Sequence, residues 1–227
     1  MKISENIKML TIDNMFPVLL WDENSLALID TGYPRHTNEL IQAIEDAGFA
    51  AKNLTHIILT HQDIDHVGCV SRLLEIAPNA KVYAHELEAP YMDGSKTPIK
   101  LAKAIASRPN QTPEQQAETD NYEKRFKEIH FPVHYKLKDG DEIDAAGGIV
   151  AVHTPGHSPG HICLYLKAAE VLVLGDSAGV DNGELTGFNP IWIDDIAKAD
   201  KTLEEIIKPY PKKAVIGHHS GFAAVKS

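Results

Sequence analysis

The chain has 227 residues, of which 43% are hydrophobic and 24% are charged, and these values are typical of a globular protein with a large buried core. Its 22 basic and 32 acidic residues give a formal net charge of −10, which opposes the electrostatic attraction that nucleic acids and anionic membranes require. We therefore expect a small-molecule substrate, with neither a nucleic-acid nor a membrane partner. The same values leave the oligomeric state open.

Two further features bear on the cellular compartment. The N-terminal residues 1–8 lack an apolar stretch of signal-peptide length, and no later run is long enough to span a bilayer. Cys69 and Cys163 lie far apart in the sequence and beside apolar residues, so neither a disulfide framework nor a structural zinc knuckle is expected. We predict a cytoplasmic protein whose two thiols are reduced and buried.

Short apolar runs and turn residues predict alternating strands and helices in the first half of the chain. Residues 18–20 and 25–29 form a predicted hairpin around a polar turn. Thr37 is the expected cap of a helix, which ends near Gly48 because glycine favours a left-handed stop. The next predicted elements are a buried strand over 57–59, a polar segment at 61–68, a helix over 70–77 and a strand over 81–84.

A region of different composition then interrupts this alternation. Residues 90–130 are rich in lysine, alanine, glutamine and glutamate, and we interpret them as a helical insertion within a single domain spanning 1–227. Thr112, Pro113 and Gln115 combine a cap, an early proline and a partner for a capping box, so a helix is expected to begin there. The elements expected afterwards are strands over 149–152, 162–166, 171–174 and 214–216, and a helix over 194–207.

The polar segment after the buried strand has the composition of a metal site. It reads Thr60-His61-Gln62-Asp63-Ile64-Asp65-His66-Val67-Gly68. A solvated polar turn would explain one or two charged residues, but not two histidines and two aspartates within six positions. Imidazole and carboxylate are the ligands that a divalent metal with an open catalytic position requires. The segment therefore predicts a metal centre at the end of that strand.

The spacing His61-x-Asp63-x-Asp65-His66 resembles the His-x-His-x-Asp-His motif of the metallo-β-lactamase superfamily, with one histidine replaced by Asp63. Further superfamily motifs follow in the same order, namely Asp30 in Leu-Ile-Asp-Thr-Gly, His157 in Thr-Pro-Gly-His, Asp176 in Leu-Gly-Asp-Ser and His218 in Ile-Gly-His. The resemblance covers nearly the whole chain. It implies an α/β (α+β) fold, the four-layer αββα sandwich, with metals where the strand-end loops converge.

The resemblance also implies a role for each matching residue. The seven implied ligands are His61, Asp63 and His157 for a first metal, Asp65, His66 and His218 for a second, and Asp176 as a bridge between them. A carboxylate suits the bridging role because its two oxygens can bind two cations and reduce their mutual repulsion. Two divalent ions are thus expected, with zinc as the first choice and manganese or iron as alternatives.

Three neighbouring residues lie outside this implied ligand set. Asp30 would accept a hydrogen bond from a ligand histidine or its loop, although an ordinary turn aspartate before Gly32 fits the sequence equally well. His161 resembles a position that supports the loop rather than the metal. His219 is expected to point to the pocket or to solvent.

The replacement of a motif histidine by Asp63 affects which metal the site is expected to prefer. A carboxylate in place of imidazole makes the site more negative and shifts its preference from zinc toward manganese or iron. Asp63 is either a ligand or faces away from the metal. We favour a ligand, because in an extended loop the alternation of side chains would give Asp63 the same direction as His61 and Asp65.

The function implied by the resemblance is metal-dependent hydrolysis, in which a metal-bridging hydroxide attacks a small ester, lactone or thioester. Asp65 would orient this hydroxide and return its proton to the leaving group. The insertion would form a wall or lid of the pocket. Two alternatives stay open: an iron-dependent oxygenase or oxygen reductase of the same superfamily, and a metal-binding module of this fold without catalysis.

Overall fold

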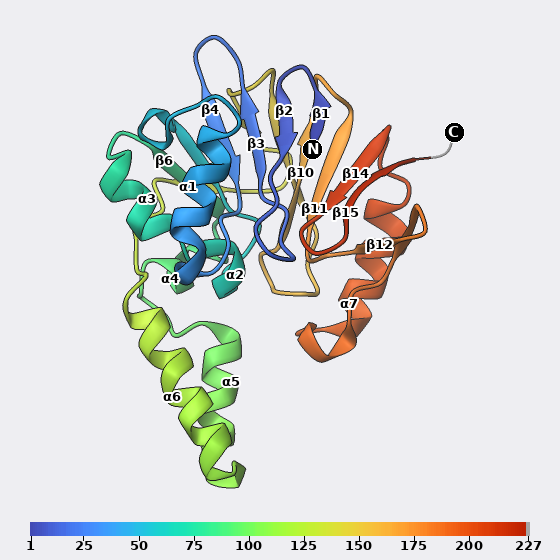
Figure 1. Cartoon of the computed structure of the whole chain (residues 1–227). Helices are drawn as coiled ribbons and strands as arrows, with labels where there is room; N and C mark the ends of the chain where they lie inside the picture. Colours follow the sequence, from blue (N-terminus) through green and yellow to red (C-terminus); the bar gives the residue numbers. More distant parts are fainter. Residues whose placement is uncertain (226–227) are drawn as a thin grey trace.

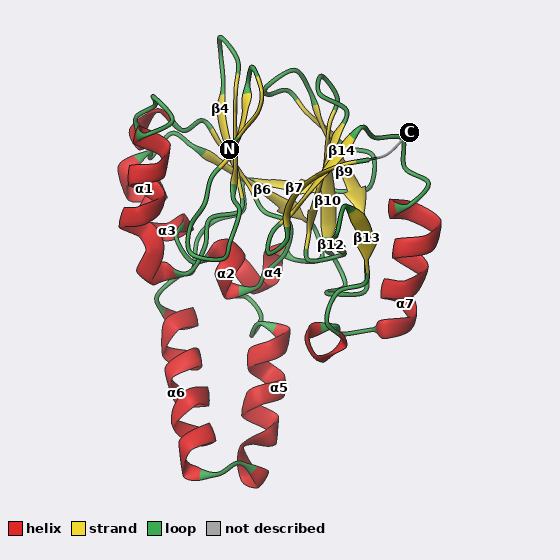
Figure 2. Ribbon diagram, turned by 45° about the vertical axis from the view of Figure 1, so that its right-hand side comes forward, coloured by secondary structure: helices red, strands yellow, loops and turns green. Residues whose placement is uncertain are grey.

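A computed structural model describes residues 1–225, so residues 226–227 of the expected domain lie outside the described residues. Two large sheets face each other, and helices cover the outer side of each sheet (Figures 1 and 2). Helices α1 (Thr37–Glu45) and α3 (Val70–Ile76) cover one sheet, and α7 (Ile196–Lys201) covers the other. This arrangement is the predicted four-layer αββα sandwich.

The first sheet contains seven strands in sequence order. They are β1 (Lys2–Ser4), β2 (Ile7–Met9), β3 (Val18–Trp21), β4 (Leu26–Ile29), β5 (His56–Ile58), β6 (Lys81–His85) and β7 (Tyr135–Leu137). Strands β3 and β4 form the predicted antiparallel hairpin, whereas β4, β5, β6 and β7 pair in parallel. The parallel strands therefore send their C-terminal loops to one edge of the sheet.

The second sheet has the strand order β15-β14-β11-β10-β9-β8. Its strands are β8 (Glu142–Ile143), β9 (Ile149–His153), β10 (Ile162–Leu166), β11 (Val171–Gly175), β14 (Ala214–Gly217) and β15 (Gly221–Ala224). A separate pair is formed by β12 (Gly179–Asp181) and β13 (Glu184–Thr186). Strands β11 and β14 are parallel, with Gly175 opposite Gly217, so the residues that follow these two strands lie side by side.

Alternating side chains along each strand serve different layers of the core. In β4, Leu28 packs toward the helices, whereas Ile29 packs into the space between the two sheets. In β11, Val173 lies between the sheets and Leu172 packs on the other face, with Ile207. Both faces of these two strands are therefore buried, which explains their continuous apolar runs.

The helices predicted between Thr37 and Gly48, over 70–77 and over 194–207 lie close to their expected positions. Gly48 has the expected left-handed backbone, with φ of +96°, after the end of α1. The prediction for Thr37 was wrong in detail, because Thr37 is the first residue of α1 rather than its cap. A 3-10 turn at Pro34–His36 precedes it, and the Thr37 hydroxyl donates to the Pro34 carbonyl at 2.8 Å. The predicted last helix consists of α7 and a π-helical continuation, Thr202–Ile207.

Between β6 and β7 lie α4 (Ala89–Met92), α5 (Ile99–Ser107), a 3-10 turn (Arg108–Asn110) and α6 (Pro113–Lys127). The predicted capping box is present, since Gln115 N donates to Thr112 Oγ1 at 3.3 Å and Thr112 N donates to Gln115 Oε1 at 2.9 Å. Helices α5 and α6 form a hairpin that projects from the body of the molecule (Figure 1).

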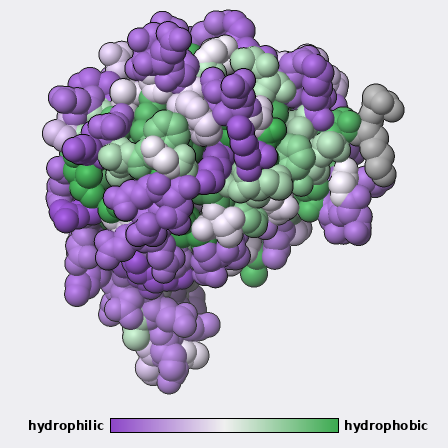
Figure 3. Space-filling view, turned by 45° about the horizontal axis from the view of Figure 1, so that its top comes forward, coloured by the Kyte–Doolittle hydropathy of each residue, from purple (hydrophilic) through white to green (hydrophobic). Residues whose placement is uncertain are grey.

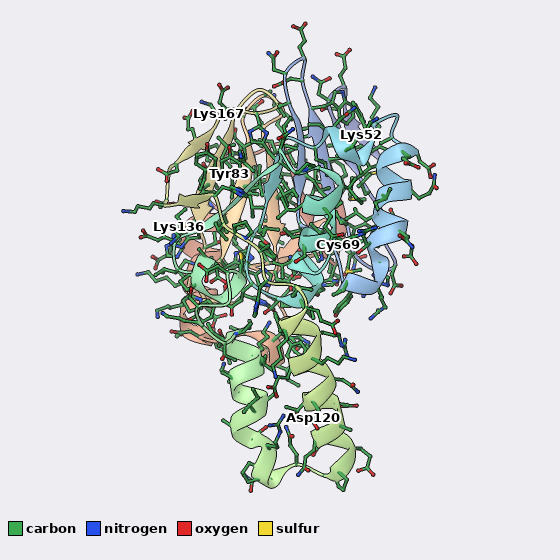
Figure 4. All side chains as sticks on the ribbon, turned by 90° about the vertical axis from the view of Figure 1, so that its left-hand side faces the viewer. Lys52, Cys69, Tyr83, Asp120, Lys136 and Lys167 are labelled. Carbon is green, nitrogen blue, oxygen red and sulfur yellow. The ribbon has the colours of Figure 1, made fainter. Side chains whose placement is uncertain are left out.

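The projecting hairpin is mainly polar on its visible surface. Figure 3 shows hydrophilic residues over most of the projecting part, whereas apolar residues gather over the body. Near its tip, Arg108 pairs with Asp120 at 2.6 Å, and Figure 4 shows Asp120 on α6, far from the sheets. Among residues 1–225, the helices fall short of the length and apolarity that a membrane-spanning segment requires.

Candidate metal centre

The predicted ligands come from loops that meet at one edge of the two sheets. Strand β5 leads into residues 59–63 and the short helix α2 (Ile64–Val67), which carry the first four candidate ligands. The loop between β9 and β10 contributes His157, and the ends of β11 and β14 contribute Asp176 and His218. Parallel pairing of β11 with β14 brings the last two together.

A first group of ligand atoms contains His61, His157 and Asp176, whose atoms all lie within 4.8 Å of one another. Asp63 adjoins this group. Its Oδ2 atom lies 3.2 Å from His61 Nε2 and 3.0 Å from His157 Nε2. The structure therefore brings together the three residues that the sequence assigned to a first metal.

A second group contains Asp65, His66, His218 and His219, again with all ligand atoms within 4.8 Å. The closest carboxylate to His219 is that of Asp65, whose Oδ2 lies 3.1 Å from His219 Nε2. The sequence placed His219 in the pocket or in solvent, whereas the structure adds it to the ligand atoms of this group. In the sequence, only its place directly after His218 pointed to His219.

Asp176 lies between the two groups. Its Oδ1 is 3.4 Å from His66 Nε2, and its Oδ2 is 3.8 Å from His157 Nε2 and 3.9 Å from His219 Nε2, so its carboxylate is close to both groups. Gly175 allows this placement, because it has φ of +54° and a Cβ there would lie 2.6 Å from His161 Nε2. A side chain at position 175 would therefore displace the histidine that supports Asp176.

The donor atoms fit divalent metal ions. His66 Nε2, His218 Nε2 and Asp176 Oδ1 are buried and form no hydrogen bond within residues 1–225. Buried polar atoms without partners are costly, and a bound cation would satisfy all three. Burial, together with the charge of His66, lowers the pKa of His61 to about 4, so that its imidazole is neutral near pH 7 and can bind a metal.

Asp30 supports this arrangement from behind His66. Its Oδ2 lies 2.9 Å from His66 Nδ1, and its Oδ1 accepts a hydrogen bond from Thr60 N at 3.0 Å. Burial opposes ionisation of Asp30, but the facing His66 and these hydrogen bonds lower the pKa of Asp30 below its usual value. Asp30 thus fixes the ring of His66 with Nε2 directed toward the site.

His161 supports Asp176 in a similar way. Its Nε2 accepts a hydrogen bond from the Asp176 backbone amide at 3.0 Å, and its Nδ1 lies 2.9 Å from Thr154 Oγ1. Burial and the neighbouring His61 hold the pKa of His161 well below its usual value, so the ring is neutral and Nε2 can accept. His161 belongs to neither group of ligand atoms.

Asp63 and Asp65 do not share the extended loop that the sequence suggested, because the backbone turns into α2 directly after Asp63. Asp63 is the residue before the helix, with extended φ and ψ of −65° and 145°, whereas Asp65 lies in the first turn of α2. The two carboxylates consequently face different groups. Asp63 still contacts His61 and His157, but for a different geometric reason from the one that the sequence suggested.

Sequence reasoning missed two residues of this region. Glu88 is fully buried and joins two ligand loops: its Oε2 accepts from Gln62 N at 3.0 Å, and its Oε1 accepts from Gly160 N at 2.7 Å. Lys100, on α5, contacts the Asp63 carboxylate and lies 2.9 Å from His157 Nε2. Neither residue belongs to a motif, so the sequence offered no local signal for them.

A cavity of about 1150 Å³ opens above the two groups. Its floor includes Asp65 and Asp176, one wall is formed by α5 and α6, and the opposite wall is formed by residues 188–194. Phe188 and Trp192 give that opposite wall an apolar surface. The predicted role of the insertion as a pocket wall therefore agrees with its position.

Comparison with known proteins shows the family to which the chain belongs. Residues 16–218 match the metallo-beta-lactamase superfamily. The chain is 31% identical to the uncharacterized protein YobT of Bacillus subtilis over 74% of this chain, and 28% identical to a hydroxyacylglutathione hydrolase of Francisella tularensis subsp. novicida over 86% of it. These matches span 65% and 61% of the two relatives, so the chain covers less than two thirds of either.

Solved structures of the same fold are also similar. A metallo-beta-lactamase family protein from Thermus thermophilus superposes with a TM-score of 0.74 at 21% identity, covering 98% of this chain and 76% of that one. At this identity the likeness concerns the fold alone. Together with the sequence match over residues 16–218, it identifies the chain as a member of the metallo-beta-lactamase superfamily.

Proposed function

We propose that this protein is a dinuclear metal-dependent hydrolase that acts on a small ester, lactone or thioester. The observation that carries the proposal is the position of Asp176, whose carboxylate lies close to histidines of both groups of ligand atoms. A carboxylate in this position suits a bridge between two cations. The similarity to a protein named hydroxyacylglutathione hydrolase supports hydrolysis of an acyl compound.

Seven residues would hold the ions, as the sequence predicted: His61, Asp63 and His157 for the first, Asp65, His66 and His218 for the second, and Asp176 for both. His219 is a further candidate at the second position, since it belongs to the same group. Bound divalent ions supply a water nucleophile of near-neutral pKa and polarise the substrate carbonyl. Zinc is the proposed metal, with manganese or iron as the alternatives that the carboxylate of Asp63 favours.

Asp65 is the proposed proton acceptor. It is only partly buried, borders the cavity and lies 3.1 Å from His219 Nε2, so a second titratable group can exchange a proton with it. Burial opposes protonation of His219, but the hydrogen bond with Asp65 and the charge of Asp176 raise the pKa of His219. Asp65 would take the proton of the attacking water and return it to the departing group.

The cavity supports a small acyl substrate. Its volume of about 1150 Å³ slightly exceeds the usual range for small-molecule sites, which is about 300–1000 Å³, so a small substrate has ample room. The apolar wall at Phe188 and Trp192 could pack against an acyl group, while polar side chains such as Asn14, Gln115 and Arg125 line other parts of the cavity. Such a lining fits a molecule with one apolar end and one polar end.

The proposal is tested by activity of the metal-loaded protein. Protein stripped of metal and then loaded with zinc, manganese or iron should hydrolyse at least one compound in a panel of chromogenic esters, lactones and thioesters. Asp176→Ala should abolish turnover in the same panel, whereas Lys124→Ala, on the projecting hairpin and outside the cavity lining, should not. Equal turnover by the Asp176 variant and the wild type would refute the proposed site.

A further inference from the structure

Lys100 places a positive charge inside the first group. Its ammonium contacts the carboxylate of Asp63 and lies 2.9 Å from His157 Nε2. The same Asp63 oxygen lies 3.2 Å from His61 Nε2. A cation of the chain itself therefore lies among the three residues proposed to hold the first metal. Lys100 belongs to α5, in the projecting hairpin, and is remote in sequence from all three.

The Lys100 ammonium and a metal ion at the first position are both positively charged, so they exclude each other. A divalent ion held by Asp63 and His157 would lie against the Lys100 ammonium, and like charges at contact distance repel strongly where water is largely excluded. The Lys100 side chain is 19% exposed and that of Asp63 is 12% exposed, so solvent screens this repulsion poorly. Either the lysine or the metal can occupy the site, but not both.

The second group lacks such a competitor. Within residues 1–225, neither Asp65 nor Asp176 forms an ion pair with a lysine or an arginine, and their charged neighbours are histidines. The two metal positions therefore differ before any metal binds. The first position already contains a lysine ammonium, whereas the side chains of the second are carboxylates and imidazoles, all of which can bind a metal.

We propose that Lys100 is an internal competitor for the first metal, so that the second position fills first and the first position fills only when Lys100 withdraws. The inference rests on the proposed metal centre and extends it by an order of loading and by a residue that controls this order. Lys100 is a positioning residue here, since it acts on the ligands and needs no contact with a substrate.

Withdrawal of Lys100 should be visible at the opposite wall of the cavity. Its Nζ lies 5.8 Å from the centre of the Trp192 ring, within reach of a cation–π interaction. The start of α5 is held separately, because Ile99 N donates to Gln62 Oε1 at 2.8 Å. Movement of the lysine side chain would therefore change the surroundings of Trp192 while the helix start remains attached to the ligand loop.

The test is a zinc titration of metal-free protein in the presence of a competing chelator. Calorimetry and tryptophan fluorescence monitor the titration. The wild type should bind two zinc ions in two separated steps. Lys100→Met keeps the length of the side chain and removes its charge, so it should tighten the weaker step about tenfold or more, the scale at which residues around a metal alter its affinity. The fluorescence change of Trp192 should accompany the weaker step in the wild type and disappear in the variant.

Lys103→Met is the matched control, because Lys103 lies one turn further along α5 and pairs with Asp194 at 2.5 Å rather than with a ligand. It should leave both zinc steps unchanged. Trp192→Phe assigns the fluorescence signal, since Trp21 is the other tryptophan of the chain. Circular dichroism of each variant establishes that it is folded.

Two results would overturn the inference. If Lys100→Met left the weaker zinc-binding step unchanged or weakened it further, the lysine would not compete with metal. The proposed metal centre itself would stand. Absence of tight zinc binding in both the wild type and the variant would overturn the proposed metal centre together with the inference. The two failures are therefore distinguishable in one experiment.

Discussion

Gln62 donates two hydrogen bonds to Glu88, one from its backbone amide at 3.0 Å and one from its side-chain amide at 2.9 Å. Gln62 lies between the proposed ligands His61 and Asp63, and the other oxygen of Glu88 accepts hydrogen bonds from the loop that carries His157. One buried carboxylate therefore connects two loops that the metal centre needs in a fixed relation.

Glu88→Ala should lower the free energy of unfolding by about 3 kcal/mol or more, because it leaves several buried donors without an acceptor. Urea unfolding of the metal-free protein measures this effect without the contribution of metal. Glu86→Ala is the control, since the Glu86 side chain is 44% exposed and its change should remain within about 0.5 kcal/mol. Equal stability of the two variants would show that Glu88 does not hold the loops together.

Asp65→Asn should reduce kcat by about a hundredfold or more, because an amide fills the same space but cannot accept the proton of the nucleophile. The loss should appear mainly in kcat, with thermal stability near that of the wild type. Steady-state kinetics on any substrate found in the panel measures it. Near-normal turnover would move the role of proton acceptor to His219, which lies 3.1 Å from Asp65.

Asp63→Ala should weaken metal binding at the first position by about tenfold or more, since a ligand contributes at least as much as the residues around it. Asp63→His should retain metal and shift the preference toward zinc. Competition between zinc and manganese on both variants measures the two effects. Unchanged affinity in Asp63→Ala would show that Asp63 is not a ligand, and the altered metal preference would then have no basis.

The two cysteines should resist thiol reagents while the protein is folded. Both are free and buried, and burial raises the pKa of the Cys69 and Cys163 thiols to about 11 (Figure 4 shows Cys69 among the helices over the first sheet). A raised pKa means that only about one thiol in a thousand is ionised at pH 8, and the thiolate is the reactive form. A colorimetric thiol assay should detect neither in native protein and both in denaturant; rapid reaction of either thiol in native protein would contradict their burial.

Much of the fold was predictable because its signals are local. The hairpin of β3 and β4, the glycine stop at Gly48 and the capping box at Thr112 depend on residues a few positions apart. The short strands β1, β2, β7, β8, β12, β13 and β15 were not predicted, since two to four residues rarely establish an alternating pattern. The π-helical end of the last helix likewise has no distinct sequence signal.

The candidate site likewise contains residues that a local sequence pattern predicts and residues that it does not. Residues at the ends of strands, such as His61 and Asp176, were predicted as site residues because motif and strand occur together in the sequence. Lys100 and Glu88 were not, because they are 37 and 26 residues from the side chains that they contact. Their contribution arises only when the insertion and the loop after β6 pack against the ligand loops, which no local pattern encodes.

The proposed dinuclear centre is tested by the metal content of the protein after it has been stripped and reconstituted with zinc, manganese or iron. Elemental analysis should find close to two divalent ions per chain, because the ligand atoms form two groups joined by Asp176. His218→Ala should reduce the content at the second position. A value of one ion or fewer with all three metals would contradict the dinuclear centre on which the proposed function rests.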